Sequence, residues 1–345
     1  MTLRHLLSWK PLFYEALLPA LRRLGPARGD AVLGAIGRLT ALGWPPRRRA
    51  LEMSLRQARS ALGADWEVRE ARDVLAGHIL RFLARDYPLH GLGDEALASR
   101  FDVHGFEHLR DALAGGRGVV LLGSHLGGHL SALHWLYRRG VPLRVLVQRP
   151  QHISATLRAR FDSDEPPHPQ TGLFLRRALP PGAAVERVLR ARAALRDGMA
   201  VYLAGDVPWS GPNARPGELL GHRRAFQSIW ADLATLARAP VVPMFCTHRP
   251  RGRFALTFDP PWSLAPGGEG AAVARYLDRL EAEVRAHPAD AVAYLTWPCY
   301  GPPSPAPRAE SGPSSQRGIG PGSVGPARPG AARAARSSTI SRPSS

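Results

Sequence analysis

The sequence predicts an α/β protein: a largely parallel central sheet flanked by helices, with an N-terminal helical region and a disordered C-terminal tail. Three observations support this prediction. Apolar residues recur at helical spacing before residue 90, short apolar runs alternate with helix-like segments between residues 101 and 258, and the composition changes abruptly after Tyr300. We therefore divide the chain into residues 1–90, 91–300 and 301–345.

The first region, residues 1–90, has the period of amphipathic helices. Two series of apolar residues recur every three or four positions: Leu51, Leu55, Ala58 and Leu62, and then Val74, Leu75, Ile79, Phe82 and Leu83. The apolar stretch 12–21 contains a glutamate and a proline, so it is too short and too polar to span a bilayer. Two placements stay open for it. It lies flat on a membrane with Trp9, Phe13 and Leu17 toward lipid, or it packs on its own domain.

The second region, residues 91–300, alternates between the two periods. Apolar runs predict strands at 118–122, 143–147, 199–203, 240–245 and 254–258. Helix-like segments lie between or before them, at 106–114, 129–139, 183–196 and 226–238. Strands that alternate with helices form parallel sheets, and functional groups of such sheets gather at the carboxyl ends of the strands.

The third region, residues 301–345, consists mainly of Pro, Ser, Gly, Ala and Arg. Its large apolar residues are only Ile319, Val324 and Ile340, so it cannot bury enough surface to offset the entropy of ordering. We expect a disordered basic tail that is dispensable for folding.

The charge balance indicates an anionic partner. Lysine and arginine total 46 against 28 acidic residues, a formal charge of +18, and Lys10 is the only lysine. Nucleic acid, phospholipid headgroups or an acidic protein would all fit, although a GC-rich coding sequence gives the same arginine bias. We exclude nucleic acid because the chain has no aromatic RNP pattern, KH loop or zinc finger. Two cysteines are too few for a disulfide framework or a four-cysteine zinc site.

One glycine-rich turn stands out after the first predicted strand of the sheet, at residues 123–130 (GSHLGGHL). His125 lies at the carboxyl end of that strand, where an imidazole that titrates near neutrality suits a general base, and Gly127 and Gly128 let a substrate approach the backbone. His125 and His129 have the i, i+4 spacing of a zinc pair, but the glutamate of H-E-x-x-H is missing, so we predict no metal. The alternative is a turn histidine that only bonds to the backbone.

Several segments carry a resemblance to a known family, in this order: 101–109 (FDVHGFEHL), 116–127 (GRGVVLLGSHLG), 147–150 (VQRP), 195–206 (LRDGMAVYLAGD), 219–226 (LLGHRRAF), 234–243 (ATLARAPVVP), 258–261 (FDPP) and 287–288 (HP). Together they resemble the lysophospholipid acyltransferase superfamily, in its branch of lipid A biosynthesis lauroyl/myristoyl acyltransferases. The resemblance implies the acyltransferase fold and covers roughly residues 10–300.

The resemblance implies a histidine and a carboxylate in the pattern H-x4-[DE]. His125 matches the histidine, but Leu130 occupies the carboxylate position. Three explanations remain open. Asp206, Glu107 or His129 replaces the missing group, the histidine alone supports slow transfer, or the chain binds lipid without catalysis. If no other group has taken over, a glutamate introduced at position 130 is expected to give a modest gain in rate.

The resemblance also implies the partners and the remaining site residues. It assigns catalysis to His125 and Asp206, and substrate binding to a larger set: Arg149, Gly127, Gly128, His129, Arg223 and Arg224. The donor would be an acyl carrier protein or CoA thioester, with no cofactor, and the acceptor a hydroxyl of a glycolipid or lysophospholipid. We expect a peripheral protein on the cytoplasmic face of the inner membrane, held by its anionic surface. The alternative is an inactive lipid-binding paralogue.

Overall fold

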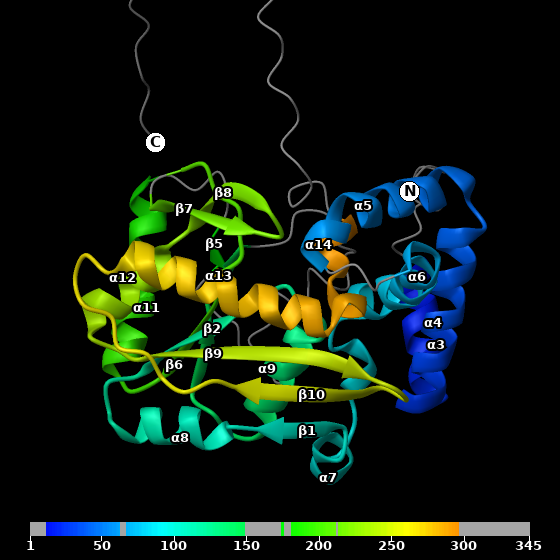
Figure 1. Cartoon of the computed structure of the whole chain (residues 1–345). Helices are drawn as coiled ribbons and strands as arrows, with labels where there is room; N and C mark the ends of the chain where they lie inside the picture. Colours follow the sequence, from blue (N-terminus) through cyan, green and yellow to red (C-terminus); the bar gives the residue numbers. More distant parts are fainter. Residues whose placement is uncertain (1–11, 63–66, 149–173, 176–180, 212, 297–345) are drawn as a thin grey trace, which may run out of the picture. The chain divides into compact units, whose positions relative to one another are not determined.

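The computed structural model describes residues 12–62, 67–148, 174–175, 181–211 and 213–296. The chain divides into two units, Met1–Pro303 and Ser304–Ser345. The first unit contains all of the described residues (Figure 1). The second unit, and with it the predicted tail, lies outside them.

The N-terminal region is helical, as its apolar period predicts. Its elements are η1 (Leu12–Leu17), α3 (Leu18–Arg23), α4 (Pro26–Leu42), α5 (Pro45–Leu62), α6 (Val68–Ala84), η2 (Tyr87–Leu89) and α7 (Asp94–Ala98). Proline opens α4 and α5, where its missing N–H would have no acceptor in any case.

The first apolar stretch packs on its own domain. Phe13 is 5% exposed and forms a small core with Tyr14, Leu18, Leu21 and Leu33. The lipid-facing placement considered for Phe13 is therefore wrong, because this side chain is already buried between the N-terminal helices. Trp9 lies outside the described residues.

The central sheet has six strands in the order β1-β10-β9-β2-β6-β3. Their bounds are β1 Phe101–His104, β2 Val119–Gly123, β3 Leu143–Val145, β6 Ala200–Ala204, β9 Val241–Arg249 and β10 Arg253–Phe258. Neighbouring strands run parallel except for the β9–β10 hairpin. The predicted α/β class with a largely parallel sheet is confirmed.

Helices cover both faces of this sheet (Figure 1). Val120 and Leu122 of β2 point into one core with α11 (Pro181–Arg196), α12 (Ile229–Ala237) and α13 (Glu269–Ala286). Val119 and Leu121 point into a second core with α8 (Phe106–Ala114) and α9 (His129–Arg138). This alternation follows from the two-residue period of a strand. After α13 the chain continues through η3 (Pro288–Asp290) and α14 (Val292–Thr296).

The sequence prediction missed β1 of the central sheet and two small sheets. β4 (Val147–Gln148) pairs in parallel with β5 (Phe174–Leu175), and β7 (Ala214–Leu219) forms a hairpin with β8 (His222–Gln227). The hairpin turns at Leu220 and Gly221, both with positive φ, as a two-residue turn requires. The helix predicted from residue 226 therefore begins only at Ile229, because Phe226 still pairs with Arg215.

Within the described residues, no helix combines the length and the apolar character needed to cross a bilayer.

Candidate active site

The register of two parallel strands brings His125 and Asp206 together. Gly123, the last residue of β2, pairs with Ala204, the last residue of β6. The pairing continues one step further, since Gly205 donates its N–H to the carbonyl of Gly123 at 2.9 Å. His125 and Asp206 each stand two residues beyond the paired strand ends, so neighbouring chains deliver them to the same edge of the sheet.

Asp206 is fully buried, and its carboxylate accepts two hydrogen bonds from His125. Its Oδ1 accepts the Nδ1–H of the imidazole at 2.9 Å, and its Oδ2 accepts the backbone N–H of His125 at 2.7 Å. Tyr294 of α14 donates its hydroxyl to Oδ2 at 2.5 Å. An ionised carboxylate only accepts, so Nδ1 of His125 carries a proton, and in the neutral imidazole the lone pair is on Nε2. The side chain of His125 is 29% exposed, whereas that of Asp206 is fully buried.

The pair favours ionised Asp206 and protonated His125. Burial by itself would lower the pKa of His125, but the charge of Asp206 and its hydrogen bond outweigh burial and raise that pKa. Burial likewise would raise the pKa of Asp206, but His125 and the hydrogen bonds it accepts outweigh this and lower that pKa. Perturbed groups at a strand end are typical of catalytic sites.

Two glycines in the loop after His125 connect it to neighbouring segments through backbone hydrogen bonds. Gly127, with φ of +51°, donates its N–H to the carbonyl of Asp290 at 3.1 Å, and Gly128 donates to the carbonyl of Cys246 at 2.8 Å. A Cβ on Gly127 would stand 2.5 Å from the Cys246 oxygen, and one on Gly128 would stand 2.7 Å from the Phe254 ring. Both glycines are buried, so the structure shows them in close packing, and their contact with substrate stays a prediction.

A comparison with protein-family models gives one match. The model described as bacterial lipid A biosynthesis acyltransferase matches residues 79–293, more than half of the chain. The chain belongs to this family. No curated protein matches it. Both His125 and Asp206 lie within the matched residues, and the predicted family is confirmed.

This member of the family lacks the carboxylate of the H-x4-[DE] pattern, and Leu130 occupies its position. Leu130 is half-buried in the first turn of α9 and packs against the second core. Of the three candidates for a replacement, the structure brings Asp206 into hydrogen bonds with His125. Glu107 is exposed on α8, where no hydrogen bond to His125 is described.

The third candidate, His129, stands beside His125 without replacing a carboxylate. The two imidazole centroids are 5.3 Å apart with the rings edge to face. Burial, and then the charge of His125, lowers the pKa of His129 to about 3. His129 is therefore neutral at physiological pH and supplies no negative charge to His125.

Of the three predicted substrate-binding arginines, the structure describes two. Arg149 lies outside the described residues. Arg223 and Arg224 stand on β8, where the Arg223 side chain is almost fully exposed, 3.9 Å from Glu218. Substrate binding by these three arginines stays a prediction.

Two clusters with metal-ligating side chains were missed in the sequence, because their members are distant in the chain. Within the described residues, His78, His248 and Asp290 form one, and Asp86, His90 and His134 form the other. In each, a carboxylate oxygen lies 2.6 Å from an imidazole nitrogen. That is a hydrogen-bond length, shorter than the separation of about 3.3 Å between ligands of a tetrahedral zinc with bonds of about 2.0 Å. We therefore assign both clusters to hydrogen bonding.

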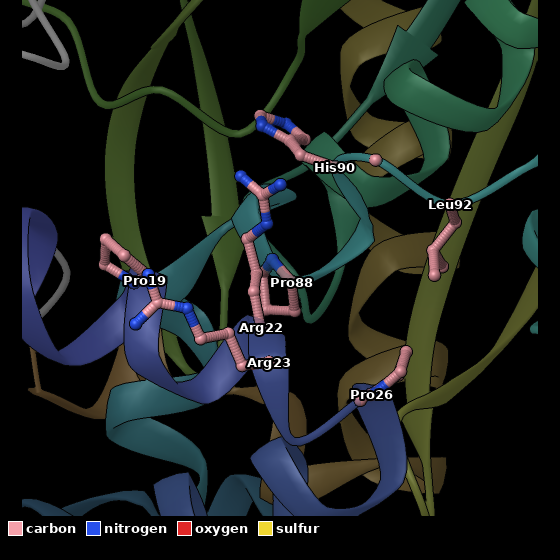
Figure 2. A pocket seen from close by; sticks show the side chains of 9 residues that line it. Pro19, Arg22, Arg23, Pro26, Pro88, His90 and Leu92 are labelled. Atoms are coloured by element: carbon pink, nitrogen blue, oxygen red, sulfur yellow. The ribbon is translucent and has the colours of Figure 1, made fainter.

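A basic hollow lies beside the second of these clusters (Figure 2). It has a volume of about 390 Å³ and is lined by Arg22, Arg23 and His90 together with prolines and glycines of α3, α4 and the turn after η2. Figure 2 shows the guanidinium of Arg22 directed toward the His90 ring. None of the lining residues belongs to the loop that carries His125, so the hollow is separate from the candidate active site.

We expect Leu130→Glu to bring no gain in transfer rate and to lower the melting temperature. Asp206 already occupies Nδ1 of His125, so a second carboxylate is redundant, and burying it without a partner destabilises the fold. The sequence predicted a modest gain in rate for Leu130→Glu only if no other group had replaced the missing carboxylate beside His125. Initial rates and melting curves, with Leu130→Gln as the uncharged control, test this. A higher transfer rate in Leu130→Glu would show that Asp206 alone does not fully orient His125 and stabilise its imidazolium.

Proposed function

We propose that this acyltransferase transfers a fatty acyl group from an acyl carrier protein or CoA thioester to a hydroxyl of a glycolipid or lysophospholipid. The hydrogen bond between His125 Nδ1 and buried Asp206 is the observation that carries the proposal. It fixes the tautomer in which Nε2 is the basic nitrogen, and it supplies the carboxylate that Leu130 cannot.

The reaction balances with these two residues. Nε2 of His125 takes the hydroxyl proton while the hydroxyl oxygen attacks the thioester carbonyl carbon. The tetrahedral intermediate collapses, the C–S bond breaks and the C–O bond of the ester remains. The thiolate leaves and takes the proton back from the imidazolium. Asp206 stays ionised throughout, holding the tautomer and stabilising the imidazolium.

The oxyanion of the intermediate needs a donor outside the loop of His125. Each backbone N–H from His125 to Gly128 is engaged: with Asp206, the Ser124 hydroxyl, Asp290 and Cys246, in chain order. Arg85 follows α6, its carbonyl accepts the Ser131 hydroxyl at 3.4 Å, and its positive charge lowers the pKa of His125 and His129. The guanidinium also forms a hydrogen bond with the Tyr14 side chain. On the strength of its charge we propose it as the group that stabilises the oxyanion.

Arg85→Gln is therefore expected to lower kcat about 10²-fold, the usual loss when one oxyanion donor is removed. Steady-state rates measure it, and Arg139→Gln, an exposed arginine after α9, serves as the control. A kcat within a factor of two of the wild type would assign the oxyanion to another donor, such as the amides in the first turn of α9.

The activity itself is tested with purified protein, acyl donors and a total lipid extract. Mass spectrometry should detect a lipid whose mass has increased by one acyl group, and the donor that supports it identifies the carrier. If no acylated lipid forms with either donor while lipid still binds, the protein is the inactive lipid-binding paralogue.

We also propose that the protein docks peripherally on the anionic cytoplasmic face of the inner membrane. The turn between α4 and α5 supports this in place of the first helix. Leu39, Trp44 and Met53 are 72%, 64% and 57% exposed, and the exposed arginines 47–49 stand among them. An interfacial tryptophan beside arginines suits lipid headgroups, each basic residue contributing about 1 kcal/mol near an anionic surface.

Binding to anionic vesicles is expected to weaken with salt and to fall at least fivefold in Trp44→Ser. Co-sedimentation with phosphatidylglycerol vesicles measures it, and Leu236→Ser, which alters an exposed leucine of α12, is the matched control. Equal loss in both variants, or binding that salt does not change, would contradict docking through this turn.

A further inference from the structure

The segment after α13 contacts both halves of the candidate active site. From this segment Tyr294 donates its hydroxyl to Asp206 Oδ2 at 2.5 Å, and the carbonyl of Asp290 accepts the N–H of Gly127 at 3.1 Å. Gly127 is two residues from His125. Asp290 and Tyr294, four residues apart in this stretch, thus bond to the loop of His125 and to the carboxylate of Asp206. The end of this stretch, α14, contacts α5 and α6 (Figure 1).

Asp290 is itself fixed on two other elements. Its buried carboxylate accepts the backbone N–H of His248 at 2.9 Å and the Nδ1–H of the same residue at 2.6 Å. The Nδ1 of His78 in α6 lies 3.3 Å from the same oxygen, Oδ1. The carbonyl that holds Gly127 is therefore tied through its side chain to β9 and to α6. Burial would raise the pKa of Asp290, but His248 and His78 outweigh burial and keep this pKa well below its usual range.

Tyr294 completes the surroundings of Asp206. Without its hydroxyl, Oδ2 would keep only the backbone N–H of His125, and the carboxylate could turn about its last bond. Such a turn would weaken the bond from Oδ1 to the imidazole, and the ring would lose its preference for a proton on Nδ1. A buried carboxylate with full hydrogen bonding is rigid, which is what an orienting group requires.

We propose that Tyr294 and Asp290 are positioning residues for the dyad: Tyr294 fixes the carboxylate of Asp206, and Asp290 fixes the loop that carries His125. The effect on rate rests on the proposed function, whereas the effect on geometry does not. Both side chains are buried and bond to the dyad or its loop, so we expect both to act through the dyad.

The first test measures the tautomer of His125 by ¹⁵N NMR above its pKa. The wild type should carry the proton on Nδ1, and Tyr294→Phe should shift a measurable fraction to Nε2. Tyr276→Phe is the matched control, since its hydroxyl is also buried but bonds to the carbonyl of Gly123 at 2.6 Å. An unchanged tautomer in folded Tyr294→Phe would overturn the role of Tyr294.

The second test follows Asp290 through amide hydrogen exchange. In Asp290→Asn, exchange at Gly127 should quicken at least tenfold, while Gly128 serves as an internal control because it bonds to Cys246. Equal acceleration at both glycines would indicate general loosening and refute the assignment. If Asp290→Asn does not fold, His78→Phe removes one anchor only, and the same comparison of the two amides applies.

Where turnover is detected, Tyr294→Phe should lower kcat about 10²-fold with KM changed less than threefold, as expected for misplacement of a catalytic group. A change confined to KM would contradict positioning. If no turnover is found but the tautomer and exchange results hold, the proposed function fails and the positioning roles remain.

Discussion

Asp206→Asn is expected to lower the rate of acyl transfer about 10⁴-fold, equivalent to about 5 kcal/mol of transition-state stabilisation. Asparagine keeps the size of the side chain but removes the charge that stabilises the imidazolium. Its amide can also present N–H to His125 and so favour the wrong tautomer. Single-turnover kinetics with acyl donor and lipid acceptor measure the loss.

The matched control for this variant is Asp259→Asn. Asp259 also follows a strand, β10, and is ion-paired, but with Arg279 at 2.8 Å rather than with a histidine. It should lower stability without slowing transfer. Comparable losses of rate in both variants would show that Asp206 matters only for folding.

The pH dependence of the transfer rate is a second test of the role of Asp206. Transfer needs neutral His125, so the rate should rise with pH through a midpoint above the ordinary value of 6.5, because Asp206 raises that pKa. In Asp206→Asn the midpoint should fall, since burial and the charge of Arg85 both lower the pKa of His125. For stability, the ion pair contributes fully between the ordinary values 3.8 and 6.5. Its contribution is lost as pH falls through the lowered pKa of Asp206 or rises through the raised pKa of His125.

His125→Ala is expected to reduce transfer by about 10²–10⁴, the usual contribution of a positioned general base. His125 is partly exposed, so the fold should lose little stability, although Asp206 is left buried with one partner fewer. The melting temperature and the rate together separate the two effects.

His108→Ala is the control for this loss. His108 in α8 is a half-buried histidine that bonds to the carbonyl of Phe258 at 2.9 Å, on the second face of the sheet. Full activity in His125→Ala would remove this residue as the base and with it the proposed mechanism.

Local sequence signals were sufficient for five of the six strands of the sheet, all but β1, and for the position of His125. Buried parallel strands read as short apolar runs, and the glycine-rich turn after one of them marks a strand end wherever the chain folds as α/β. The β7–β8 hairpin was missed because its strands, ARPGEL and HRRAFQ, contain few large apolar residues. The burial of Phe13 was undecided, since an amphipathic stretch has the same pattern against lipid as against another helix.

What the sequence by itself determined is the family, the α/β class and a histidine at a strand end with no carboxylate at position 130. Only the tertiary structure decided which carboxylate serves His125. Asp206 is 81 residues away, and its arrival depends on the pairing of Gly123 with Ala204. Asp290 and His78, 212 residues apart, meet for a similar reason. Register and packing bring such residues together, and no local period in the chain encodes them.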